Sequence, residues 1–250
     1  MSQFSAQRAL MKSNFPDLDR IASDQKLGRT QPPLEKPAPE GVKPIALPSV
    51  DPAMLSERDF HTCLKRRRSR RSWIDGGLQL EELSYLLWAT QGVQRVFGRN
   101  YSTFRPVPSG GGRHPFETYV AVSRVDGLAA GVYRYLPLTH ALCLLRETAD
   151  LAGPITDAAL GQDFVGGAPV VFIWSCIPYR GEWRYHVAAH KIMLLDAGHL
   201  CQNLYLACEA IGCGTCAVAA YDQRLIDAVV GVDGEDEFVV YLAPVGKVRH

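Results

Sequence analysis

The stretch HVAAHKIMLLDAGHLCQNLYLACEAIG, residues 186–212, decides how this chain folds. It contains no proline and closes on Gly212, and both features predict one long helix over residues 185–211. Apolar residues occur on every side of that helix rather than along one stripe. We therefore expect a central helix that is buried all round, with Leu204 as a position that could face a partner chain.

Four polar side chains interrupt this helix: Asp196, His199, Gln202 and Asn203. Their spacing of i, i+3, i+6 and i+7 places them along one stripe. Buried polar groups need hydrogen-bond partners, and either a second copy of the helix across a symmetric homodimer or a bound cofactor would supply them. We interpret His199 as a hydrogen-bonded core histidine rather than a metal ligand.

The segments around the helix predict a central sheet covered by helices. An amphipathic helix is expected from Leu80 and should stop at Gly92. Five stretches have the composition of strands, and several are apolar on both faces. They are TYVAVSRV (118–125), GVYRYL (131–136), APVVFIW (168–174), TCAVAAY (215–221) and FVVYLAPV (238–245). The simplest division is one α+β domain over residues 51–250.

Residues 1–50 are expected to form an extended N-terminal arm. The row QPPLEKPAPEGVKPIALPSV, residues 31–50, is rich in proline, which removes backbone donors and fixes φ. This arm is either a flexible linker or a segment that wraps a partner subunit through Leu34, Ile45 and Leu47.

Composition sets the broad class of the protein. The 250 residues are 47% hydrophobic, and 27 Lys and Arg against 26 Asp and Glu leave a net charge of +1, so no overall field attracts nucleic acid or an anionic membrane. No apolar run approaches the length of a membrane helix, and the N-terminus lacks a signal-peptide pattern. The 7 cysteines form no disulfide framework, so we expect a cytoplasmic protein. The pair Cys213 and Cys216 follows a helix end and is expected to serve packing.

The basic run KRRRSRRSW, residues 65–73, has three interpretations. It could be a nucleic-acid or targeting patch, a solvated charge run, or a phosphate cradle. We favour the cradle, because guanidinium groups bind a phosphate dianion bidentately and Ser69 adds a hydroxyl donor.

Two further motifs suit a flat anionic ligand. The loop PSGGGRHPFE, residues 108–117, could be only a hairpin tip, yet its glycines would let the backbone approach a ligand closely. No dinucleotide fingerprint or P-loop is present in the sequence. In the C-terminal PVGKVRH, Lys247 and Arg249 are either a solvated tail or a pair that closes over an anion.

Taken in order, five motifs resemble the nitroreductase superfamily of FMN-dependent oxidoreductases. They are RRRSRR (66–71), LEELSYLLWATQGV (80–93), PSGGGRHPFETYV (108–120), DAGHLCQNLYLACEAIGCGT (196–215) and VGK (245–247). The resemblance is greatest to the SagB-type branch, which includes the thiazole- and oxazole-forming dehydrogenases, and it runs from about Ser23 to the C-terminus.

The resemblance implies a nitroreductase-like α+β fold: a central, mostly antiparallel sheet flanked by helices, in an intertwined homodimer with FMN at each subunit interface. The residues that match cofactor-binding positions are Arg67, Arg68 and Ser69 for the phosphate and ribityl chain, Arg71 for the flavin pyrimidine edge, Pro108, Ser109, Gly110, Gly111 and Gly112 for the loop beneath the ring, Ala219 and Ala220 after the long helix, and Lys247 and Arg249 for the phosphate.

The sequence also departs from the family pattern. Gly112 stands where simple nitroreductases often have Asn, and Ala219 with Ala220 replaces an acid-glycine pair. The best match to the Lys-Tyr pair of the azoline-oxidising branch is Arg184 and Tyr185. Arginine stays protonated and cannot act as a general base near neutral pH, which weakens the azoline interpretation. The candidate catalytic residues are Arg71, Arg184 and Tyr185.

The implied activity is electron transfer from NADH or NADPH through FMN to a small electron-poor acceptor, such as a nitroaromatic or a quinone. One alternative is an azoline dehydrogenase acting on a thiazoline or oxazoline in a modified peptide. Another is a non-catalytic protein that binds flavin or nucleic acid. The expected partners are a second copy of the chain and small molecules, without nucleic acid, membrane or metal.

Overall fold

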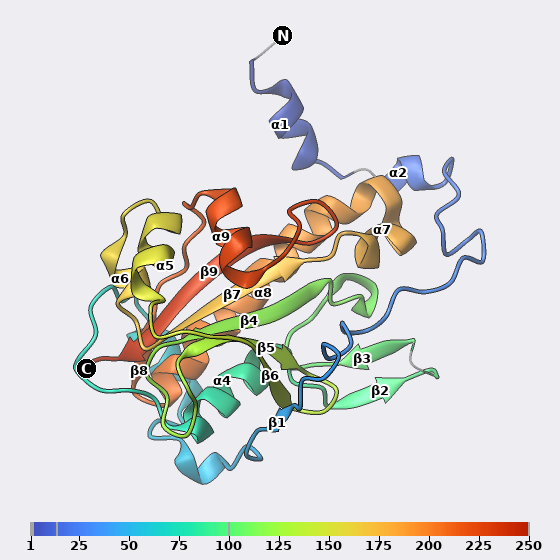
Figure 1. Cartoon of the computed structure of the whole chain (residues 1–250). Helices are drawn as coiled ribbons and strands as arrows, with labels where there is room; N and C mark the ends of the chain where they lie inside the picture. Colours follow the sequence, from blue (N-terminus) through green and yellow to red (C-terminus); the bar gives the residue numbers. More distant parts are fainter. Residues whose placement is uncertain (1–2, 14, 100, 250) are drawn as a thin grey trace.

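The centre of the computed structural model, which describes residues 3–13, 15–99 and 101–249, is a seven-stranded sheet (Figure 1). Its order is β1-β6-β5-β4-β7-β9-β8, and every neighbouring pair is antiparallel. Its strands are β1 (Ile45–Ala46), β4 (Phe116–Val122), β5 (Gly131–Leu136), β6 (Ala141–Glu147), β7 (Val170–Cys176), β8 (Cys213–Thr215) and β9 (Phe238–Lys247). A separate hairpin pairs β2 (Arg95–Phe97) with β3 (Ser102–Phe104). The predicted α+β fold with a mostly antiparallel sheet is confirmed.

Helices cover both faces of the sheet, because alternate side chains of each central strand belong to two apolar cores. On β4, Val120 and Val122 pack with α4 (Leu80–Gln91) and α8 (Ala189–Ala210). Its other face contacts a second core. The helices of that second core are α5 (Ala152–Ala158), α6 (Asp163–Gly166) and α9 (Gln223–Val230). The remaining helices are α1 (Ser5–Leu10), α2 (Phe15–Leu18), α3 (Phe60–Arg66) and α7 (Tyr179–Tyr185), with short 3-10 turns at Pro52–Met54, Gly110–Gly112 and His186–Ala188.

Four of the five predicted strands are present with shifted ends, and α4 stops before Gly92 as predicted. The prediction of a strand over TCAVAAY, residues 215–221, is wrong. β8 ends at Thr215, and the next residues leave the sheet because the amide of Ala217 donates to the Tyr205 hydroxyl at 2.8 Å. Val218 returns only for an isolated bridge with Leu242. Strand β6 and most of the short helices were not predicted.

The long helix begins later than predicted. His186 has a φ of 42°, which breaks the helical path, so α7 ends at Tyr185 and α8 starts at Ala189. Within a single chain α8 is not buried all round, so its burial on every side stays a prediction for the homodimer. One side is exposed; it carries His190, Leu194, Leu195, Gly198, His199 and Gln202. Leu204 is fully buried and faces the core of its own chain.

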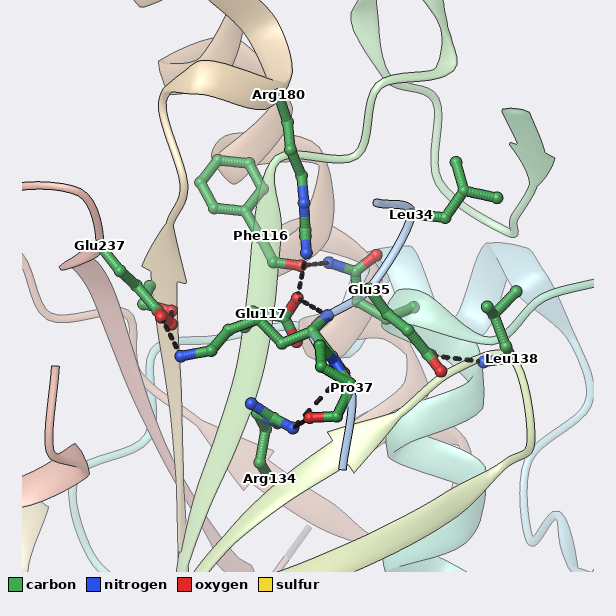
Figure 2. A network of polar contacts seen from close by, with 12 residues as sticks. Leu34, Glu35, Pro37, Phe116, Glu117, Arg134, Leu138, Arg180 and Glu237 are labelled. Atoms are coloured by element: carbon green, nitrogen blue, oxygen red, sulfur yellow. Dashed lines mark hydrogen bonds and ion pairs between the residues drawn. The ribbon is translucent and has the colours of Figure 1, made fainter. Parts of the chain in front are cut away.

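The proline-rich stretch 31–50, which the structure describes throughout, lies against its own chain and forms only the edge strand β1. Figure 2 shows its anchor. The backbone amide of Lys36 donates to Glu117 at 2.9 Å, and its ammonium pairs with Glu237 at 2.5 Å. Glu117 also pairs with Arg180 at 2.5 Å, and both of these side chains are less than 5% exposed. Arg134 donates to the carbonyl of Pro37. Within the described ranges, no helix is both long and apolar enough to cross a membrane.

Candidate functional site

The first half of the candidate site gathers around Tyr205 on α8. The guanidinium of Arg67 lies over the Tyr205 ring, 5.3 Å from its centroid. The hydroxyl groups of Ser69 and Tyr205 are 3.1 Å apart, and Tyr205 also accepts the amide of Ala217. The backbone holds this arrangement, because the residue after Ser69, Arg70, donates its amide to the Thr215 carbonyl at 2.9 Å. Tyr205 thus joins the basic run to the loop that follows β8.

Four of the other predicted residues make no hydrogen bond or ring contact with Tyr205 in the part of the chain that the structure describes. Arg68 donates to the carbonyls of Lys65 and Arg67, and Arg71 lies over the ring of Phe164, 5.8 Å from its centroid. The ammonium of Lys247 pairs with Glu82 at the start of α4. Arg249 is exposed after β9. The structure therefore brings Arg67 and Ser69 together, while Arg68, Arg71 and Lys247 contact other groups and Arg249 is exposed.

The two alanines lie on the exposed loop beyond β8. Ala219 and Ala220 are both exposed, and the Ala220 carbonyl accepts a hydrogen bond from Gln162 at 3.0 Å. They follow Ala217, which is bound to Tyr205, so they border the first half of the site through the backbone.

The second half of the candidate site is the glycine loop, which Asp196 holds. Ser109 donates its hydroxyl to Asp196 at 2.7 Å, and the amide of Gly110 donates to the same carboxylate at 3.1 Å. The Ser109 hydroxyl also accepts the amide of His114 at 2.9 Å. Burial raises the pKa of Asp196, and the hydrogen bonds from the loop oppose that shift. Asp196, noticed in the sequence only as one member of a polar stripe, therefore fixes the loop.

The three glycines are needed for space. A Cβ on Gly110 would collide with Ile192, one on Gly111 would lie 2.5 Å from the Tyr185 hydroxyl, and one on Gly112 would collide with the Ser102 hydroxyl. Gly112 also has a φ of 62°. The side chain of Ser102 on β3 thus lies where a side chain at position 112 would begin, so it would have to turn away to admit an asparagine.

A cluster of polar and aromatic side chains borders the glycine loop. Arg184 donates to the hydroxyl of Tyr101, and Gln25 donates to the same oxygen at 2.9 Å. Arg113 stacks over the Tyr101 ring at 4.6 Å from its centroid, and Arg184 lies over the ring of Tyr185 at 5.4 Å. The predicted pair Arg184 and Tyr185 therefore lies next to Gly111 and is joined by a phenol that the sequence did not indicate.

The remaining polar residues of α8 divide between the chain interior and solvent. Asn203 donates to the Ala89 carbonyl at 2.9 Å, while Gln202 is exposed. The Nδ1 of His199 is 4.0 Å from Asp196, and its side chain is half exposed. Burial raises the pKa of Cys213 to about 12, so this thiol of the CxxC pair stays protonated at neutral pH.

Acid is expected to destabilise the region next to the glycine loop through His114. Burial and the nearby Arg105 lower the pKa of His114 to about 2. A histidine in the unfolded chain titrates near pH 6.5. Below that pH the unfolded chain therefore binds a proton at His114 that the folded chain does not bind. His114 therefore contributes full stability above pH 6.5, and the loss by pH 5 is about 2 kcal/mol.

Urea unfolding at pH 7 and pH 5 measures this loss. His114→Asn is the matched variant, because asparagine tolerates the φ of 43° at this position and does not titrate. The variant should lose about 2 kcal/mol less than the wild type between the two pH values. Equal losses in both proteins would assign the acid sensitivity to other groups.

The two halves lie at different levels of one helix. Asp196 holds the glycine loop near the start of α8, and Tyr205 holds the basic run nine residues later. At 1.5 Å per residue, this separation is about 13 Å along the axis. Tyr205 could have been noticed as the one aromatic residue of 189–210, but no sequence signal marks Tyr101 or Gln25.

Comparisons with known proteins show that the chain is similar to nitroreductases. The model of the nitroreductase family matches residues 64–247. A protein of Methanocaldococcus jannaschii that carries the nitroreductase name is 32% identical over 203 residues, which cover 81% of this chain and 96% of that protein. A crystal structure from Ralstonia eutropha, also of a protein named as a nitroreductase, has a TM-score of 0.67 at 27% identity and covers 88% of this chain and 99% of that one.

The microcin B17-processing protein McbC of Escherichia coli is also similar. It is 26% identical over 137 residues, which cover 53% of this chain and 50% of McbC. This similarity confirms the resemblance to the SagB-type branch.

Proposed function

Because the chain belongs to the nitroreductase family, we propose that it is an FMN-dependent oxidoreductase that takes electrons from NADH or NADPH. The proposed acceptor is a small electron-poor molecule, a nitroaromatic or a quinone. The observation that carries this proposal is the arrangement around Tyr205. Arg67 is held above that ring beside the Ser69 hydroxyl, and among the described residues no carboxylate lies within 4 Å of its guanidinium.

The residues present fit the phosphate of FMN. A guanidinium without a counter-ion and a neighbouring hydroxyl are the donors that a phosphate dianion takes. Arg68 follows directly in the chain, and Lys247 would join them by leaving Glu82. Bound FMN would supply hydride and electron transfer, while the protein supplies position and charge.

The position of the glycine loop supports a site built from two subunits. Within one chain the loop and the Tyr205 cradle lie about 13 Å apart along α8. A two-fold axis that pairs the exposed sides of two α8 helices in antiparallel fashion would set the loop of one subunit beside the cradle of the other. We therefore propose a homodimer with two such sites.

The proposed roles of the other residues follow from their chemistry. The backbone of 108–112, fixed by Asp196, would support the flat ring of the cofactor, and Arg71 would place positive charge at its pyrimidine edge. The guanidinium of Arg184 has hydrogen-bond donors and no acceptor, so it would orient an electron-rich oxygen of the acceptor. Tyr101 and Tyr185 have the hydroxyl groups that could deliver a proton.

Absorbance spectroscopy tests the activity. Purified protein supplied with FMN should be yellow, and its absorbance should bleach on addition of NADH or NADPH and return with a quinone. Protein that takes up no FMN would refute the proposal. The choice of acceptor is read from a panel of nitroaromatics and quinones against the reduced protein.

Replacement of Arg67 should release the cofactor without unfolding the chain. Arg67→Gln removes one hydrogen-bonded charge contact, worth roughly 1.5 to 3 kcal/mol, so FMN affinity should fall about ten- to hundredfold. The control is Arg66→Gln, the neighbouring arginine, which pairs with Glu57 at 3.2 Å on the surface. Fluorescence titration of FMN measures both. Unchanged affinity in Arg67→Gln would place the phosphate elsewhere.

A second candidate function is azoline oxidation in a modified peptide. It is favoured by the similarity to the microcin B17-processing protein and by the phenol of Tyr101 beside Arg184, because Arg184 itself cannot accept a proton. In this reaction the azoline would give up one hydride, which bound FMN would accept, and one proton, which a base would accept. A thiazoline peptide incubated with the protein should lose the mass of two hydrogens. Tyr101→Phe should then change the pH dependence of the rate of azoline oxidation. Quinone reduction measured with the same variant tests the first proposal separately.

A further inference from the structure

A cavity of about 660 Å³ lies between the proline-rich arm and the central sheet. Residues 36–40 of the arm form one wall, β4, β5 and β6 form the floor, and the end of α9 closes the other side. Its floor includes Tyr119 and Val132, which belong to the core on the α9 face of the sheet. The cavity therefore lies on the face opposite α8, Asp196 and Tyr205, and a volume of several hundred Å³ is typical of small-molecule sites.

Two arginines line this cavity, Arg134 and Arg146, and Glu35 interacts electrostatically with Arg134 without forming an ion pair. Arg134, which is 3% exposed, donates to the Pro37 carbonyl, and its Nε has no hydrogen-bond partner within the described part of the chain. Arg146 donates to the Val229 carbonyl at 3.1 Å. Among the described residues, neither guanidinium has a carboxylate within 4 Å. A buried charge without a counter-ion in contact is costly, and this cost falls on Arg134, whereas Arg146 is exposed. Figure 2 shows Arg134 turned toward the arm that forms the cavity wall.

The other groups around the cavity add to this charge balance. Lys36 is neutralised by Glu237, whereas Glu40, the acidic residue of the lining, is exposed on the arm. Val132, Leu145 and Val229 give the cavity an apolar side. The lining thus combines a cationic end with an apolar wall, which is the complement of an anion that carries an apolar body.

We propose that this cavity binds a small organic anion, whose carboxylate or phosphate pairs with Arg134 and Arg146 and whose apolar part packs against Val132, Leu145 and Val229. Such a ligand would join the arm to the sheet and to α9. This second site is independent of the proposed flavin site, because the two share none of their residues.

Calorimetric titration with phenyl phosphate and with hexanoate tests the proposal, in the presence of excess FMN so that the cradle around Tyr205 is occupied. Saturable binding of at least one probe is expected, and the stronger probe identifies the headgroup. Inorganic phosphate, which lacks the apolar body, should bind at least tenfold more weakly than phenyl phosphate. Absence of saturable binding by both organic probes would overturn the proposal.

Two arginine variants locate the binding. Arg146→Gln should lower the affinity for the probe about ten- to hundredfold, because it removes one charged contact from the cavity rim. The matched control is Arg124→Gln, since Arg124 is also exposed and donates to one backbone carbonyl, that of Gly167, at 2.9 Å. An equal loss of probe affinity in both variants would mean that general surface charge, and not the cavity, causes the effect.

A third variant separates this site from the flavin cradle. Arg67→Gln should leave probe binding unchanged. Loss of binding in Arg67→Gln with retention in Arg146→Gln would place the anion at the cradle and refute the cavity site, while leaving the flavin proposal intact.

Discussion

A glutamate at position 194 is expected to turn the protein into a monomer that does not hold FMN. Leu194 is 64% exposed on the open side of α8, four residues before Gly198, where a second α8 helix could pack closely. Obligate homodimers commonly bury about 2,000 to 5,000 Å² or more, and a charge at the centre of such an interface is left unpaired. Because the glycine loop and the Tyr205 cradle would come from different subunits, the cofactor should be lost together with the dimer.

Light scattering with flavin absorbance recorded on the same chromatographic peak measures both properties. The control is Leu225→Glu, since Leu225 is 48% exposed on α9, on the opposite face of the sheet, and should leave a yellow dimer. A wild-type protein that is yellow as a monomer near 27.6 kDa would contradict both the interface and the shared site.

Glu117→Gln should lower the free energy of unfolding by about 3 to 5 kcal/mol. The substitution keeps the shape of the side chain but leaves Arg180 as a buried charge without its counter-ion, and it weakens the bond to the Lys36 amide. The control is Glu57→Gln, because the pair of Glu57 with Arg66 is solvent-exposed and should be worth less than about 1 kcal/mol.

Urea unfolding measured by circular dichroism compares the two variants. Equal midpoints for Glu117→Gln and the wild type would mean that the buried pair contributes no net stability. A protease digest of the arm adds a local measurement, since residues 31–50 should become more accessible in Glu117→Gln and not in Glu57→Gln.

Patterns that act within one element could be predicted from the sequence. The limits of α4 follow from apolar spacing and Gly92, and β5 follows from the strand-type composition of its row. The strand after Thr215 failed because the contact that removes Ala217 from the sheet comes from Tyr205 on another element. The sequence of α8 indicates apolar residues around the whole helix, but it does not indicate which side packs within the chain and which is left open.

The candidate site divides in the same way. The basic run and the glycine loop could be predicted as motifs, but the residues that fix their positions could not. Asp196, Tyr205 and Tyr101 act through contacts across many residues of sequence, and no local pattern reports such contacts. Arg71 and Lys247 matched family positions, yet their partners in this chain are Phe164 and Glu82.

The pairing of Lys36 with Glu237 joins residues 201 positions apart, which has a consequence for synthesis on the ribosome. The arm leaves the ribosome about 200 residues before its carboxylate partner, which lies just before β9. Contacts between such distant residues form slowly, because the entropy cost of closing a long loop comes before the contact can stabilise the fold. Until Glu237 has been made, the arm can be held only by its other contacts, such as those with Glu117 and Arg134, so a chaperone that binds extended segments could compete for it during that interval.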